Sequence, residues 1–557
     1  MNGIRLHASI VGVCVVALWA APALACHDSG RPVPKSSRPA TLMRGLGDHH
    51  HPITTSSAEA QKFFDQGLRL IYAFNHDEAV RAFTRASELD PKAPMPVWGV
   101  ALALGPNINL DVDPEREKAA YVAVQRALGL VAAARDDERA YVQALAHRYS
   151  DDPGADLKAL AVTYSRAMHD VAAAHPDDLD AATLYAESLM DLNPFKLWTA
   201  DGKPADGTEE IVATLEGVLR RDPRHLGANH YYIHAVEASP HPERALSCAA
   251  RLPTLAPAAG HLVHMPAHVY MRTGDYAGAS RANEAAVQAD RAYLRAGGPA
   301  DGVYPLLYLT HNFQFLSASS GMAGDSGSAE RAAAGIAGNM ARVPLEGPLL
   351  GLVEYFMPTP YFVALRFGRW DRLTRMPAPD PRLVATTAFR HFARAVAFAS
   401  TGAGDRARSE SAAFDQARTQ VPPETMLNLN RTDDVFRVAR AVLDARLAAA
   451  AKDHDGAVAA WRRAVERQDA LAYDEPPAWY YPVRESLGGA LYAAGRPAEA
   501  EAVFRDDLAR NPRSGRSLFG LREALRAQGK TVAADAVDRE FRAAWSTADV
   551  QPRMETL

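Results

Sequence analysis

The sequence predicts an all-α protein, a right-handed α-solenoid built from stacked helical hairpins. Alanine is abundant, and the alternation of apolar and polar residues that is typical of strands is scarce. The histidine spacing indicates the same fold, because His230 and His234 recur as His264 and His268, each 34 residues further on. Since 34 residues is the length of a common helical-hairpin repeat, the two pairs are expected at equivalent positions of neighbouring hairpins.

Composition limits the classes of function. The 557 residues are 48% hydrophobic and 23% charged, which is typical of a folded chain. The formal net charge is -5, without the basic excess of a nucleic-acid-binding domain, so no nucleic-acid partner is expected. Beyond the first 25 residues no stretch is apolar enough to span a membrane, so no transmembrane segment is expected.

Residues 1–25 have the features of a secretory signal peptide. Arg5 precedes an apolar run over residues 8–20, and Ala23 and Ala25 provide the small residues of a cleavage site. We therefore expect an exported, periplasmic protein.

The mature chain would begin at Cys26. A cysteine at this position is also where a lipid anchor is attached, so an outer-membrane lipoprotein is the alternative. Ala23 departs from the leucine usual in the lipoprotein motif, however. In an oxidising compartment Cys26 could form a disulfide with Cys248. The preferred interpretation is that Cys248 is a small buried residue of a helix.

Residues 26–56 are rich in Pro and Ser and predict a flexible arm. The arm ends in His49, His50 and His51, followed by Pro52. Such a run can bind a metal loosely, but it is more often solvated, and solvated histidines are the expectation here.

Helical hairpins are predicted beyond the arm, and the pattern is clearest in the units that begin at Ala60, Tyr481 and Gly515. The predicted regions are N-terminal hairpins over 57–222, central units over 223–345, C-terminal hairpins over 346–545 and a polar tail over 546–557.

The unit from Ala60 explains the pattern physically. Gly67 and Ala79 are small, which lets the two helices of a hairpin approach closely. Phe83 is large and fills the space toward the next hairpin, and Pro91 ends the second helix because it lacks an amide donor.

On these residues the chain resembles the tetratricopeptide-repeat superfamily over residues 57–545. It is also similar to a group of exported, divergent bacterial tetratricopeptide proteins, through the blocks Asn-His-Tyr-Tyr-Ile-His at 229–234 and His-Met-Pro-Ala-His at 264–268. The resemblance implies that the first helix of each hairpin lines a concave face, where positions 2, 5, 9, 12 and 13 of the repeat contact ligands.

The resemblance places polar residues at these positions of three units, which begin at Leu226, Gly260 and Thr310. We predict that they line a groove for a protein or peptide partner, or for a small anionic ligand. The predicted groove residues are Asn229, His230, His234, Glu237, His261, His264, His268, Arg272, His311 and Gln314.

A metal site is the alternative for the same histidines. Residues four apart share one face of a helix, and neutral imidazole suits Zn or Cu. The predicted metal ligands are His230, His234, His264 and His268. The His-Glu-x-x-His pattern of zinc hydrolases does not occur, so no acid stands between two ligands as a general base. Pro266 is expected to kink the helix between His264 and His268, which affects how well their rings converge.

Three functions follow from these observations. The preferred one is an exported scaffold that holds a ligand or partner in a histidine-lined groove. The second is a metalloprotein, either a metal-dependent hydrolase or a metal carrier. The third is a purely structural role for the histidines. We expect binding rather than catalysis, and no catalytic residue is assigned.

Overall fold

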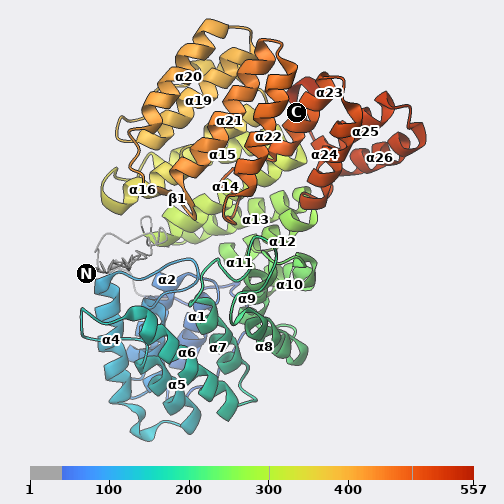
Figure 1. Cartoon of the computed structure of the whole chain (residues 1–557). Helices are drawn as coiled ribbons and strands as arrows, with labels where there is room; N and C mark the ends of the chain where they lie inside the picture. Colours follow the sequence, from blue (N-terminus) through green and yellow to red (C-terminus); the bar gives the residue numbers. More distant parts are fainter. Residues whose placement is uncertain (1–39, 300–301, 480) are drawn as a thin grey trace, which may run out of the picture.

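The computed structural model describes residues 40–299, 302–479 and 481–557. The predicted signal peptide and Cys26, with the lipid anchor and the disulfide considered for it, lie outside these residues. Within them, helices stack one after another as hairpins (Figure 1). The only strands there are β1 (Met426–Leu427) and β2 (Asn430–Arg431), which form a short antiparallel pair. The predicted all-α solenoid of helical hairpins is confirmed.

The first helices, blue to teal in Figure 1, pack around a small-against-large contact. The ring of Phe83 lies so close to Gly67 and Gly99 that a Cβ atom at either glycine would come within 2.5 Å of it. This is the contact that the repeat pattern predicts. The helices are α1 (Ala58–Ile71), α2 (His76–Leu89), α3 (Pro94–Leu104), α4 (Pro114–Leu128), η1 (Val131–Ala133), α5 (Asp136–Ala146), α6 (Leu157–Ala174), α7 (Leu179–Met190) and α8 (Thr208–Arg221).

The central helices, green to yellow in Figure 1, lie between the two ends of the array. Pro266 breaks what would be one first helix, because it has no N–H to donate, so α11 ends at His264 and α12 begins at Pro266. Cys248 is buried on α10 and has no disulfide partner among the described residues. The helices are α9 (Leu226–Val236), η2 (Pro242–Ala245), α10 (Leu246–Leu255), α11 (Gly260–His264), α12 (Pro266–Thr273), α13 (Tyr276–Arg295), η3 (Tyr304–Tyr308), α14 (Leu309–Ala323) and α15 (Ser326–Met340).

The C-terminal helices repeat the packing of the first ones. The ring of Phe504 lies against Gly488 and Gly520, where added Cβ atoms would come within 2.4 and 2.2 Å of it. The helices are α16 (Gly347–Phe356), α17 (Thr359–Arg366), α18 (Trp370–Arg375), α19 (Val384–Ser400), α20 (Gly404–Arg418), α21 (Thr432–Ala450), α22 (His454–Asp469), α23 (Val483–Ala493), α24 (Pro497–Arg510), α25 (Gly515–Ala527), α26 (Thr531–Ala544) and η4 (Met554–Thr556).

Two large apolar cores fill the array, one over residues 46–308 and one over residues 361–557. A smaller core around α14, α15 and α16 lies between them. The predicted tail contributes to the second core through the buried Leu557. Among the helices of the described residues, none is long and apolar enough to cross a membrane.

Residues 40–56, which we call the strap, contain no helix but lie packed against the N-terminal hairpins. Leu46 and Ile53 are buried in the first core. Gly45 accepts a hydrogen bond from the amide of Ala258, and the amide of Met43 donates to Gln66. This half of the predicted flexible arm is therefore held in place by contacts along its length.

Candidate metal centre

Six histidines from the first helices of three successive hairpins meet in the interior. They come from α9, α11, α12 and α14, and Pro266 does not prevent the rings on either side of it from converging. Five of them are buried and His311 is half-buried. They form two sets, in each of which one ligand atom per residue lies within 4.8 Å of the others. Triad 1 is His230, His234 and His261, and triad 2 is His264, His268 and His311.

The rings of each triad face one another through Nε2. In triad 1, the Nε2 atoms of His230 and His261 are 3.1 Å apart. In triad 2, the Nε2 atoms of His264 and His268 are 2.7 Å apart, and the ring centroid of His311 is 4.9 Å from that of His264. The triads are neighbours, since the ring centroids of His234 and His268 are 5.5 Å apart.

The other ring nitrogen, Nδ1, is engaged by acceptors in four of the six rings. His230 Nδ1 donates to the backbone carbonyl of Tyr72 at 2.7 Å. His264 Nδ1 donates to Oδ1 of Asn283 at 2.6 Å, and that amide is oriented by its own donation to the carbonyl of Ala279.

Two glutamates orient the remaining pair. His234 Nδ1 donates to Glu237 at 2.7 Å. His268 Nδ1 donates to the second oxygen of Glu237 and to Glu475 at 2.8 Å. One carboxylate, Glu237, therefore holds a ring from each triad.

These contacts fix the tautomers. A neutral imidazole carries one proton, and a proton on Nδ1 leaves Nε2 as a bare acceptor. In His230 and His264 the bare Nε2 thus faces Nε2 of another histidine of the same triad, and Nε2 of His234 has no hydrogen-bond partner among the described residues. Metal-binding histidines have this arrangement, in which one nitrogen is held by an acceptor and the other faces the ion.

The electrostatics keep most of these rings neutral. Burial lowers the pKa of His234 and His311 to about 3, with the neighbouring His268 acting in the same direction. Burial and adjacent histidines hold the pKa values of His261 and His264 well below the usual range. Burial also acts to lower the pKa of His268, but Glu237 and Glu475 outweigh it and raise the value to about 10.

The remaining predicted groove residues lie around the triads. The side chain of Asn229 donates to the carbonyls of Pro223 and His225 and not to a ring of the triads. Arg272 donates to the backbone carbonyl of Glu237 at 3.1 Å. Gln314 is buried on α14.

The grouping of the histidines differs from the predicted one. The sequence grouped four histidines around one ion, whereas the structure divides them between two triads and adds His261 and His311. The histidines also face one another in the interior, where Tyr72 at the end of α1 and Glu475 in its loop contact them on the face on which an open groove was expected.

The sequence interpretation missed Glu475, Asn283 and Tyr72. Glu475 lies in the loop between α22 and α23, more than 200 residues after His268 along the chain, and no local pattern marks it. Its loop is held by Asp474, which accepts hydrogen bonds from Asn428 at 2.6 Å and Asn430 at 3.3 Å.

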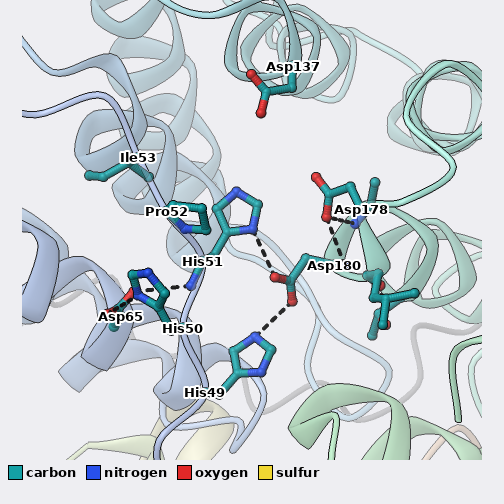
Figure 2. A network of polar contacts seen from close by, with 12 residues as sticks. His49, His50, His51, Pro52, Ile53, Asp65, Asp137, Asp178 and Asp180 are labelled. Atoms are coloured by element: carbon teal, nitrogen blue, oxygen red, sulfur yellow. Dashed lines mark hydrogen bonds and ion pairs between the residues drawn. The ribbon is translucent and has the colours of Figure 1, made fainter. Parts of the chain in front are cut away.

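A second cluster of histidines and acids surrounds Asp180 on α7 (Figure 2). His49 and His51 of the strap each donate to Asp180 at 2.9 Å, and Tyr72 donates to it at 2.5 Å. Nε2 of His225 lies 3.2 Å from the same carboxylate. Burial acts to raise the pKa of Asp180, but the histidines outweigh it and hold the value well below the usual range.

This second cluster is an anchor for the strap. His49, His225 and Asp180 have ligand atoms within 4.8 Å of one another. However, Nδ1 of His225 accepts the amide hydrogen of Ala228 at the start of α9, so its proton must be on Nε2, which faces Asp180. His225 therefore offers no free lone pair to an ion. The expectation of solvated histidines does not describe His49 and His51, which are largely or fully buried.

The fold and the centre together define the class: a helical-repeat protein with a buried cluster of histidines and glutamates. No protein-family model matches the chain, and no curated protein matches it. Solved structures with some similarity include the human IFIT1 dimer with m7Gppp-AAAA, at 14% identity, 88% coverage of this chain, 91% of that chain and a TM-score of 0.29.

Two further solved structures are similar to a comparable degree. The Cut9–Hcn1 hetero-tetramer of APC/C is 11% identical, covers 90% of this chain and 95% of its own, and has a TM-score of 0.27. The P58(IPK) TPR domain is 12% identical, covers 85% of this chain and 99% of its own, and has a TM-score of 0.23. The fold assignment rests on the hairpins of this chain and not on these overlaps.

Proposed function

We propose that this protein is a metal-binding helical-repeat protein, in which each of the two triads binds one transition-metal ion. The observation that carries the proposal is that each triad brings three histidine ligand atoms within 4.8 Å of one another, with four of the six rings held through Nδ1. If both rings were neutral, the Nε2 lone pairs of His264 and His268 would repel at 2.7 Å, and either a proton shared by the two rings or a metal ion bound to both removes that repulsion.

A proton is the rival cation. In the metal-free protein, a second proton on His268 would bridge to His264, which agrees with the raised pKa of His268. That state buries an imidazolium and leaves Nε2 of His234 without a hydrogen-bond partner among the described residues. An ion in each triad satisfies these nitrogens, so metal is favoured over protonation.

The ligand set points to the kind of ion. Three neutral imidazoles suit zinc or copper, and three protein ligands leave a coordination position open, as in catalytic sites. Both functions considered from the sequence, a metal-dependent hydrolase and a metal carrier, are compatible with such a centre.

Metal analysis tests the proposal. Protein purified without a histidine tag and reconstituted with Zn(II) or Cu(II) should retain about two ions per chain. His234→Ala and His268→Ala should each remove one ion, while His169→Ala and His241→Ala, on exposed side chains, should remove none. Retention of less than half an equivalent of metal per chain after reconstitution would contradict the proposal.

Partner binding by the surface of the array is the second candidate function, supported by the stacked hairpins, since repeat arrays present extended binding surfaces. We further propose that the protein acts after export, supported by the leader-like residues 1–25. Cell fractionation should find the processed chain outside the cytoplasm. Cross-linking in that fraction should capture a partner equally well with the His234→Ala and His268→Ala variants, because those side chains are buried.

A further inference from the structure

A hollow opens beside His234 of triad 1, between the ends of α7 and α9 and three loops. It measures about 340 Å³ with the open space at its mouth included, and its enclosed end has room for a group the size of a water molecule. Its lining residues fall into a polar set and an apolar set, which we call the polar wall and the apolar wall. The polar wall is His234, Glu237, Tyr473 and Glu475, and the apolar wall is Ile108, Met190, Phe195, Leu197 and Ala238.

Two buried polar atoms in the polar wall lack a partner. Neither Nε2 of His234 nor Oε1 of Glu475 has a hydrogen-bond partner among the described residues. Leaving a buried carboxylate oxygen unsatisfied is costly, so a hydrogen-bond donor belongs next to it. In the proposed function the His234 nitrogen is satisfied by the ion of triad 1, and a donor for the Glu475 oxygen must come from the hollow or from the hydroxyl of Tyr473, whose pKa burial and Glu475 raise.

Glu475 is held in a single orientation. Its other oxygen accepts from Nδ1 of His268 at 2.8 Å. Its loop is anchored on one side by Asp474 and on the other by Gln468, which donates to the carbonyls of Trp479 and Tyr481 at 3.2 Å. The unpartnered oxygen is therefore a fixed acceptor in the wall of the hollow.

The charge of the polar wall selects the ligand. Glu237 and Glu475 both line the hollow, so an anionic ligand such as the one considered from the sequence would be repelled at that wall. A neutral group that offers an oxygen to the ion and a proton to Glu475 fits both requirements. The apolar wall suits a hydrocarbon body that extends toward the mouth.

We propose that this hollow binds a small, neutral hydroxyl compound, such as a short-chain alcohol, as the ligand of the triad 1 ion. The hydroxyl oxygen binds the ion in its open position, and the hydroxyl hydrogen is donated to Oε1 of Glu475. The hydrocarbon part lies against Ile108, Met190 and Leu197. This inference rests on the proposed function, because the ion supplies one of the two contacts.

The test uses the full-length protein loaded with Co(II), whose visible spectrum responds to its ligands. Titration with 1-propanol should change the spectrum in a saturable way. Its isomer ethyl methyl ether, which has the same atoms but no hydroxyl hydrogen, should bind at least about 10-fold more weakly, because hydrogen bonds to charged groups are among the stronger ones. Equal binding of alcohol and ether would overturn the proposal.

Glu475→Gln gives a sharper test. Nδ1 of His268 needs an acceptor, so the amide oxygen should turn toward His268 and the amide NH2 toward the hollow. An acceptor thereby becomes a donor, and the affinity for 1-propanol should fall by about 10-fold or more when the variant is measured at saturating cobalt. Glu410→Gln, at a carboxylate that pairs with His391 far from the centre, is the matched control.

The possible results separate the two proposals. If the wild-type protein fails to load Co(II), the proposed function fails. If it loads Co(II) but 1-propanol gives no saturable change, only the ligand proposal fails. Leu197→Trp should fill the hollow and abolish the response to alcohol at unchanged cobalt content, and an unaltered response in this variant would also overturn the ligand proposal.

Discussion

The Nε2 atoms of His264 and His268 lie 2.7 Å apart, although both rings donate through Nδ1. Two neutral rings would place bare acceptors at that distance, so either a proton on Nε2 of His268 or a metal ion bound to both rings is needed. The centre is therefore built for an occupant that carries positive charge, and this requirement leads to the first prediction.

Removal of metal should destabilise the folded protein. An ion that binds only the native state adds about 4 kcal/mol of stability when its concentration is 1,000 times its Kd. Treatment with EDTA followed by gel filtration should therefore lower the Tm by several degrees, and Zn(II) should restore it. A Tm that is the same with EDTA and with Zn(II) would contradict the prediction.

Replacement of Glu237 should weaken both triads at once, because its two oxygens hold His234 and His268. Loss of such an orienting carboxylate typically lowers metal affinity by about 10- to 100-fold. For Glu237→Gln we expect weaker binding of both ions in a competition titration against a chelator.

Asn283→Ala is the comparison for that experiment, since Asn283 holds only His264. It should weaken the triad 2 ion alone. If Glu237→Gln affects one ion only, the two triads are not coupled through this carboxylate.

The strap should loosen as the pH rises through about 9. Burial acts to lower the pKa of His51, but Asp180, with Asp178 and Asp137 further away, raises it to about 9. Because the folded value exceeds the usual 6.5, the contribution of His51 to stability is complete below about pH 6.5 and is lost as the pH rises through about 9. Amide exchange within residues 49–54, corrected for its intrinsic pH dependence, should accelerate over this range.

Asp180→Asn provides the check on the cause. It removes the charge that raises the pKa of His51, so the strap amides should exchange rapidly at all pH values and lose the transition near pH 9. A transition that persists in this variant would assign it to another group.

Gly67→Ala should destabilise the first hairpin. The new methyl group would lie within 2.5 Å of the buried ring of Phe83, and overpacking of this kind costs about 1–3 kcal/mol. Gly338→Ala on α15, where no atom lies within 4 Å of the added Cβ, should instead be neutral or stabilise by up to about 1 kcal/mol. Urea unfolding of both variants measures the difference, and equal effects would contradict it.

The sequence by itself determined the helical hairpins and their phase. The 34-residue recurrence and the pairs spaced by four residues predicted that His230, His234, His264 and His268 lie on neighbouring helices, and the structure places them on α9, α11 and α12 with their rings close together. Helix periodicity is a local property, so a single sequence is enough to reveal it.

Only the tertiary structure decided how these side chains are grouped and oriented. The division into two triads depends on how far each hairpin is rotated against the next. The acceptors that hold the rings, Tyr72, Asn283 and Glu475, come from other elements of the chain, and the Glu475 loop packs against His268 of the buried centre. Such contacts arise from packing between elements far apart in the chain, and the spacing of residues along one segment carries no record of them.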